Sequence, residues 1–128
     1  MIYLDTSVAL AHLLAEDKHP PEALWKQSLV SSRLLEYELW TRLNARGLAG
    51  SHGEPARRLL QRLAFLELLP NVLSRALQPF RVPVRTVDAV HLASMDFLRT
   101  VDPHLQLASY DDHLVSCARA LGVGIARM

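Results

Sequence analysis

The amino-acid sequence predicts an α/β fold in which helices flank a central, mostly parallel sheet on both faces. Two observations support this prediction. Short apolar segments of strand length alternate with longer segments of helical periodicity, and proline and glycine residues separate these elements without forming a linker or a repeat. Strands that alternate with helices usually form a parallel sheet, because each helix returns the chain to the same edge of the sheet. We expect residues 1–128 to form one domain.

The chain opens with a predicted strand and a predicted helix. Residues 2–4 are apolar and predict a short buried strand. Asp5, Thr6 and Ser7 follow at once, and their side chains are of the kind that caps a helix N-terminus. We therefore expect a helix over residues 8–15.

The next segments predict a strand and two helices. In order, we expect a strand over residues 29–31, a helix over 33–46 and a loop over 48–53. Gly47 supplies the left-handed residue that often ends a helix. Glu54 and Pro55 suit the first turn of the following helix. The apolar face of that helix carries Leu59, Leu60 and Leu63. Its opposite, basic face carries Arg57, Arg58 and Arg62.

The second half of the chain repeats the alternation. The expected elements are a strand over residues 65–69, a helix starting at Asn71, a helix over 87–100, a strand over 105–108, a helix over 112–121 and a terminal apolar segment over 123–126. Thr86 and Asp111 are the expected N-caps of the last two helices. Gly122 is the expected C-terminal stop of the final helix.

Composition excludes several classes of protein. The net charge of +1 argues against indiscriminate coating of nucleic acid, although it allows a local basic patch. Cys117 is the only cysteine, so the chain can form neither an internal disulfide nor a cysteine-based zinc cluster. The sequence starts without a basic leader and has no apolar run that approaches about 18 residues. We therefore expect a cytoplasmic protein with no membrane segment.

Four acidic residues occupy positions that a shared site would need. Asp5 and Asp111 follow predicted strands, and ligands of open parallel sheets bind beyond the carboxyl ends of the strands. Asp88 starts a helix that must pack nearby. Glu38 lies in a mostly apolar helix, where an unpaired carboxylate is costly. We expect these four carboxylates to face one pocket.

Each acid also has a structural explanation. The three aspartates stand at helix starts, where a cap contributes about 1 kcal/mol, and Glu38 can pair with Arg42 one turn later. Convergence favours the functional explanation. Two carboxylates about 4 Å apart repel by roughly 4 kcal/mol at an effective dielectric of 20, unless a proton or a cation compensates. All-oxygen clusters suit hard ions such as Mg²⁺ and Mn²⁺.

The segments MIYLDTSVAL, SSRLLEYELWTRL, TVDAVHLAS and ASYDDHLVSCARALGV resemble, in order and spacing, the acidic motifs of PIN domains, especially those of VapC-type toxins. The resemblance spans nearly the whole chain. It implies a three-layer sandwich with a central sheet and a ribonuclease that serves as the toxin of a toxin-antitoxin pair. It also implies an RNA substrate, a cognate antitoxin, a homodimer and one or two Mg²⁺ or Mn²⁺ ions.

The resemblance assigns roles residue by residue. The residues matching the family's catalytic and metal-binding acids are Asp5, Glu38, Asp88 and Asp111. Thr6 and Ser109 match polar residues that flank the pocket. Asp112 is either an outer ligand or a solvated residue at the helix start. Glu36 and Glu38 point about 200° apart on a helix, so only one can face the pocket; periodicity does not choose, and the resemblance selects Glu38.

Other functions and other residues leave alternatives open. The chain can be a non-catalytic PIN-like interaction domain, or an aspartate-based phosphatase or receiver-like domain, although Ser7 stands where a phosphatase needs a second acid. His91 shares a helical face with Asp88, and we expect it to pack or to form hydrogen bonds instead of binding zinc. Two further sets of residues each allow two interpretations. One set either guides RNA or forms a solvated helix face: Arg42, Arg46, Arg57, Arg58 and Arg62. The other set either packs in the core or lines a groove for a partner helix: Trp25, Leu39, Trp40 and Leu43.

Overall fold

The computed structural model describes all residues, 1–128, and its centre is a five-stranded sheet in the order β3-β2-β1-β4-β5. Every neighbouring pair of strands is parallel. The strands are β1 (Ile2–Leu4), β2 (Leu29–Ser32), β3 (Ala64–Leu66), β4 (Gln106–Ala108) and β5 (Gly124–Ile125). The prediction of a central parallel sheet is therefore confirmed.

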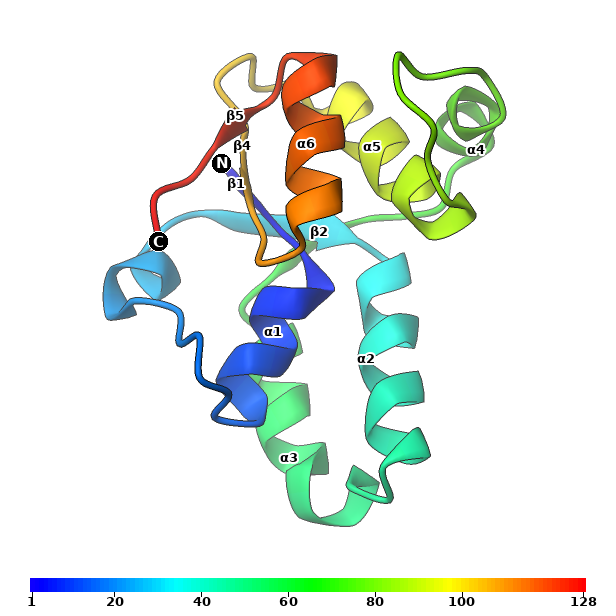
Figure 1. Cartoon of the computed structure of the whole chain (residues 1–128). Helices are drawn as coiled ribbons and strands as arrows, with labels where there is room; N and C mark the ends of the chain where they lie inside the picture. Colours follow the sequence, from blue (N-terminus) through cyan, green and yellow to red (C-terminus); the bar gives the residue numbers. More distant parts are fainter.

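Helices cover both faces of this sheet, as Figure 1 shows. They are α1 (Thr6–Leu13), α2 (Leu34–Ala45), α3 (Ala49–Leu60), α4 (Pro70–Ala76), α5 (Thr86–Leu98) and α6 (Asp112–Leu121), with a 3-10 helix η1 (Glu22–Lys26). Helices α1 to α3 lie on one side of the sheet, and α4 to α6 lie on the other. No helix is both long and apolar enough to cross a membrane.

Alternation along the strands divides the core into two clusters. Leu4 and Leu29 belong to the cluster beneath α1 to α3, whereas their neighbours Tyr3 and Val30 belong to the cluster beneath α5 and α6. Successive strand residues point to opposite faces, so each strand supplies both layers. This arrangement is the expected three-layer sandwich.

The order of the strands places a crevice beside β1. The chain passes from β1 outward through β2 to β3 and then returns to form β4 on the opposite side of β1. Leu4 is in register with Ala108, and the Asp5 N–H donates to the Ala108 carbonyl at 3.0 Å. Ligands of open α/β sheets bind at such a reversal of strand order, beyond the carboxyl ends of the strands.

The prediction for the third helix was wrong at its start. Residues 48–53 do not form a loop, because α3 already begins at Ala49 and Pro55 lies inside it. Gly47 has a φ of +67° and turns the chain sharply, so α2 and α3 pack as a short hairpin. A β-carbon on Gly53 would lie 3.5 Å from the Trp40 ring. The burial of Ala56 and Leu59 and this close packing favour the helix, although Pro55 lacks one backbone hydrogen-bond donor.

Smaller corrections concern a strand, a cap and the core. The third strand ends at Leu66 and not at residue 69, and the following helix begins at Pro70, one residue before Asn71. Thr86 is the first residue of α5 and not its cap; the N-cap is Arg85, whose side chain binds Asp88 instead. A groove for a partner helix is not formed by Leu39 and Leu43, because both are fully buried in the core. Trp25 and Trp40 are partly buried and pack against the same core.

Candidate metal centre

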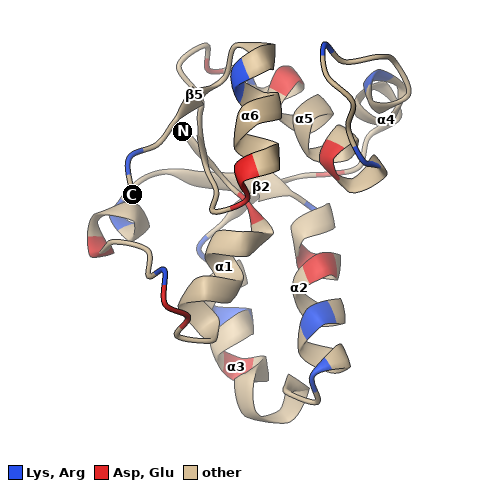
Figure 2. Ribbon diagram, viewed as in Figure 1, with Lys and Arg blue, Asp and Glu red and all other residues tan.

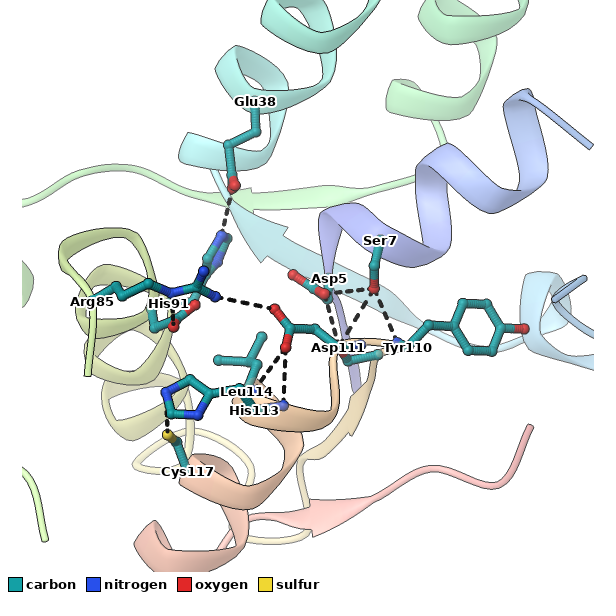
Figure 3. A network of polar contacts seen from close by, with 12 residues as sticks. Asp5, Ser7, Glu38, Arg85, His91, Tyr110, Asp111, His113, Leu114 and Cys117 are labelled. Atoms are coloured by element: carbon teal, nitrogen blue, oxygen red, sulfur yellow. Dashed lines mark hydrogen bonds and ion pairs between the residues drawn. The ribbon is translucent and has the colours of Figure 1, made fainter. Parts of the chain in front are cut away.

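A cavity of about 400 Å³ lies at the carboxyl ends of β1 and β4, and all four predicted acids line it. Asp5 follows β1, Glu38 comes from α2, Asp88 from the first turn of α5 and Asp111 from the N-cap of α6. Figure 3 shows Asp5, Glu38 and Asp111 approaching one another from different elements of the fold. The fold therefore brings together residues that lie up to 106 positions apart in the sequence.

Asp5 is held by hydroxyl groups and does not cap its helix. Its carboxylate is nearly buried and makes no capping hydrogen bond to α1. Instead, Asp5 Oδ2 accepts hydrogen bonds from Ser7 Oγ at 2.6 Å and from Ser109 Oγ at 2.8 Å. Ser7 Oγ and Ser109 Oγ in turn accept the backbone N–H groups of Tyr110 and Asp111. The hydroxyls thus orient Asp5 and the loop after β4 together.

The two glutamates of α2 point in different directions. Glu38 faces the cavity, where its Oε1 accepts from Thr6 Oγ1 at 3.0 Å. Glu36 lies away from the cavity and accepts a hydrogen bond from Arg33 Nη1 at 3.0 Å. The expected separation of the two side chains on the helix is therefore present. Thr6 and Ser109 both lie beside the acids, as predicted.

Asp111 serves two purposes with its two oxygens. Oδ1 caps α6 by accepting the backbone N–H groups of His113 and Leu114 at 3.0 and 3.2 Å. Oδ2 faces the guanidinium of Arg85 at 3.6 Å. The capping explanation and the site explanation of this residue thus hold together. Asp112, by contrast, is exposed and does not line the cavity, as expected for a solvated residue at a helix start.

Arg85 compensates the negative charge of the cavity. Its Nε donates to Asp88 Oδ2 at 3.2 Å, so one guanidinium bridges Asp88 and Asp111. The hydrogen bond to Asp88 raises the pKa of Arg85, and the arginine stays charged. Asp88 is buried, with 6% of its side chain exposed, whereas the Arg85 side chain is 71% exposed. The cation therefore lies on the solvent side of the two carboxylates.

The donor set fits a hard divalent ion. Four carboxylates from four elements, supported by hydroxyls, offer the oxygen ligands that Mg²⁺ and Mn²⁺ prefer. As arranged around Arg85, no three acidic, histidine or cysteine side chains are close enough to hold one ion together. Metal binding would therefore require side-chain rotations that bring Asp88 and Asp111, which are paired with Arg85, closer to Asp5 and Glu38.

His91 links the site to the core. The residue is 1% exposed and its Nε2 lies 2.6 Å from Glu38 Oε1, so its predicted role in hydrogen bonding is confirmed. Burial lowers the pKa of His91, but the hydrogen bond to Glu38 and the charges of Glu38, Asp5 and Asp88 outweigh burial and leave that pKa raised. On its other side, His91 Nδ1 lies 2.6 Å from Tyr3 Oη.

Comparison with known proteins supplies the family. The family model of the PIN domain matches residues 2–120. The chain belongs to the PIN domain family. It is 29% identical over 130 residues to Ribonuclease VapC35 of Mycobacterium tuberculosis, from the strains CDC 1551 and H37Rv, an alignment that covers 98% of this chain and 95% of that protein. A solved toxin-antitoxin complex from Klebsiella pneumoniae contains a chain of similar fold, with a TM-score of 0.65, 16% identity and 87% of each chain covered.

Sequence reasoning missed Arg85 and the contact of Ser7 with Asp5, and it did not place Arg42 at the acids of this PIN domain. Arg85 and Arg42 line the cavity beside the acids, and Ser7 binds Asp5. Arg85 stands three residues before Asp88, and that spacing on a helix was the available signal. Ser7 stands two residues after Asp5, a position that the sequence connects with helix capping and with the second acid that a phosphatase would need. For Arg42, no pattern in the sequence indicates the direction in which its long side chain points.

Proposed function

We propose that this chain is a divalent-metal-dependent endoribonuclease and the toxin of a toxin-antitoxin pair. The observation that carries the proposal is the convergence of Asp5, Glu38, Asp88 and Asp111 on one cavity of a PIN-domain chain. The name of the mycobacterial relative, a ribonuclease, indicates the substrate class. An RNA substrate would place the activity in the cytoplasm.

The residues of the cavity have separate roles in this mechanism. The four carboxylates would hold Mg²⁺ or Mn²⁺, which supplies Lewis-acid activation of water and of the phosphate oxygens. Ser7 and Ser109 keep Asp5 directed at the cavity, and Thr6 does the same for Glu38. Arg42 and Arg85 line the same cavity and can donate paired hydrogen bonds to phosphate oxygens.

The direct test measures RNA cleavage and metal binding on the same preparation. We expect cleavage of single-stranded RNA in Mn²⁺ or Mg²⁺ and none in excess EDTA. Isothermal titration calorimetry with Mn²⁺ should show saturable binding that Asp88→Asn weakens. Cleavage that continues in EDTA would refute the proposed metal dependence, and a chain that binds ions but cleaves no RNA would favour the non-catalytic alternative.

A second cavity gives the proposed RNA strand a path away from the acids. This cavity, of about 610 Å³, shares Arg42 with the metal centre and also contains Arg46, Lys18 and the Tyr110 ring. Figure 2 shows the acidic residues of α2 nearer the sheet and its basic residues further along the helix. Glu16 and Asp17 lie on the same cavity and limit how closely a backbone approaches that wall. We therefore expect the phosphates to follow α2.

The other arginines provide a matched control for this path. Arg58 and Arg62 line a separate cavity beside His12, and Arg57 pairs with Glu54 and covers Trp40. We expect Arg42→Gln and Arg46→Gln each to weaken binding of a non-cleavable RNA oligonucleotide and to make the slope of log K against log salt shallower by about 0.7. Arg58→Gln and Arg62→Gln should leave the slope unchanged. Equal effects of both pairs would assign the RNA path to the α3 arginines as well.

The proposed antitoxin would act on the same carboxylates. Arg85 shows that a guanidinium fits between Asp88 and Asp111, so an arginine from an inhibitor can form the same charge-assisted hydrogen bonds. Inhibition and metal binding should then compete. We expect the product of the adjacent gene to suppress RNA cleavage and to raise the Mn²⁺ concentration needed for half-maximal binding. A complex that cleaves RNA as fast as the free chain would contradict this proposal.

A homodimer is the remaining part of the proposal. Leu69, Leu73 and Leu77 are exposed by 37%, 39% and 89% and recur every four residues along α4 and its ends. Such a stripe of exposed leucines suits an apolar contact between two copies. Sedimentation should show a dimer that Leu73→Asp converts to a monomer. Monomeric wild-type chain would refute the dimer without bearing on the nuclease.

A further inference from the structure

A buried series of hydrogen bonds connects the backbone of β2 to the carboxylate of Glu38. The Ser32 N–H donates to Tyr3 Oη at 3.3 Å, Tyr3 Oη lies 2.6 Å from His91 Nδ1, and His91 Nε2 lies 2.6 Å from Glu38 Oε1. Tyr3 is fully buried and His91 is 1% exposed. Figure 3 shows the His91 ring directed at the Glu38 side chain and joined to it by a dashed line.

The donors in this series have defined directions. A carboxylate only accepts, so His91 Nε2 carries hydrogen and donates to Glu38 Oε1. In neutral His91, Nδ1 then has no hydrogen and accepts from the Tyr3 hydroxyl, whose oxygen accepts from the Ser32 N–H. In protonated His91, Nδ1 carries hydrogen as well and donates to Tyr3 Oη. In both states Nε2 donates to Glu38.

This donation determines which oxygen of Glu38 is left for a ligand. Oε1 accepts hydrogen bonds from both His91 and Thr6. Oε2 makes no hydrogen bond within the chain and remains for the cavity. A carboxylate held at one oxygen by two donors keeps its orientation, which is how outer residues of metal sites direct the ligands. The T-shaped contact of the Tyr3 and His91 rings, at 83°, fixes the imidazole plane.

The series also ties Glu38 to the strand that carries Asp5. Tyr3 belongs to β1, two residues before Asp5, and its side chain points to the α5 layer. Asp5 is thus placed by β1 directly, and Glu38 is placed by the same strand through Tyr3 and His91. The positions of the Asp5 and Glu38 carboxylates therefore both depend on β1.

We propose that Tyr3 and His91 are positioning residues that orient Glu38 for metal binding, without touching metal or RNA. This inference rests on the proposed metal-dependent function. It assigns a role in the site to a fully buried tyrosine that does not line the cavity.

Tyr37 supplies a matched control for Tyr3. Tyr3→Phe removes the hydroxyl between Ser32 and His91. Tyr37→Phe removes a hydroxyl from an exposed residue next to Glu38 in the sequence. Loss of an outer residue typically weakens metal affinity 10- to 100-fold, so we expect Tyr3→Phe to weaken Mn²⁺ binding about 10-fold by calorimetry. Tyr37→Phe should match wild type.

Nitrogen-15 NMR of the histidine rings supplies a readout that a purely structural role would not move. In wild type, we expect His91 at high pH to be the neutral form with hydrogen on Nε2. In Tyr3→Phe, Glu38 still accepts from Nε2 but Nδ1 has lost its donor, so we expect the nitrogen-15 shift of Nδ1 to move to that of an imidazole nitrogen that accepts no hydrogen bond. Circular dichroism checks that each variant is folded.

A second substitution keeps the test decisive if Tyr3→Phe does not fold. The amide nitrogen of glutamine can take the place of His91 Nε2 as a donor to Glu38, whereas asparagine is too short. His91→Gln should therefore retain more Mn²⁺ affinity than His91→Asn. In a Glu38→Gln background, Tyr3→Phe should cause no further loss, because the carboxylate through which it acts is gone.

The outcomes separate this inference from the proposed function. Wild-type chain that binds no Mn²⁺ would overturn both. Wild-type binding with unchanged affinity and an unchanged Nδ1 shift in Tyr3→Phe would overturn the positioning role alone. A loss of affinity in Tyr3→Phe that persists undiminished in the Glu38→Gln background would also overturn it, since the effect would then not pass through Glu38.

Discussion

We expect Asp88→Asn to lower the rate of metal-dependent RNA cleavage by at least about 100-fold while leaving the fold intact. The substitution removes a charge from the cavity but almost no volume. Asp88 pairs with Arg85, whose side chain is 71% exposed, and a pair with so exposed a partner contributes little to stability. Single-turnover cleavage in saturating Mn²⁺ measures the first effect, and thermal unfolding measures the second.

Asp5→Asn and Asp111→Asn should behave in the same way. Asp111 needs the conservative change in particular, because its Oδ1 caps α6 and asparagine caps a helix about as well as aspartate. Asp111→Ala, which removes both functions, should in addition lower stability by about 1 kcal/mol. Comparing the two variants separates the cap from the site.

Asp112→Asn is the control for these three variants. Asp112 is adjacent to Asp111 in the sequence, but it is exposed and lies outside the cavity. Its replacement should change the rate less than the other three. Cleavage at the wild-type rate by any two of the Asp5, Asp88 and Asp111 variants would refute the site.

The sheet and its helices were predictable because they follow from short-range patterns. Alternating apolar segments predicted the layers, and Gly47 and Gly122 predicted helix ends that the structure confirms with φ values of +67° and +93°. The start of α3 was not predictable in this way. Glycine and proline favour a loop over residues 50–55, and packing against other elements favours the helix instead: Ala56 and Leu59 are buried in the core, and Gly53 lies close to Trp40 of another helix.

The position of each acid was predictable, but its partners were not. Residues that follow parallel strands share one edge of the sheet, which was enough to group Asp5 and Asp111. The bond between Glu38 and His91 joins residues 53 positions apart, and Arg85 reaches its acids through a long side chain. Such contacts depend on the packing of α2 against the rest of the fold and on rotamers. Neither leaves a periodic signal in the sequence.

Glu38→Gln and Glu36→Gln test the one choice that periodicity left open. In Glu38→Gln, the amide oxygen can still accept from Thr6 and His91, which turns the NH₂ group toward the cavity. An NH₂ group donates hydrogen bonds and cannot coordinate a cation. We therefore expect the variant to stay folded, to bind Mn²⁺ at least about 10-fold more weakly and to cleave RNA about 100-fold more slowly.

Glu36→Gln makes the same chemical change two residues away, where the carboxylate pairs with Arg33 outside the cavity. Arg33 keeps its hydrogen bonds to Glu67, and the Arg33 and Glu36 side chains are about one third exposed, so little stability should be lost. Calorimetry and single-turnover cleavage on both variants decide the assignment. Loss of Mn²⁺ binding in Glu36→Gln with wild-type binding in Glu38→Gln would reverse it, and would require α2 to be rotated by about half a turn relative to the sheet.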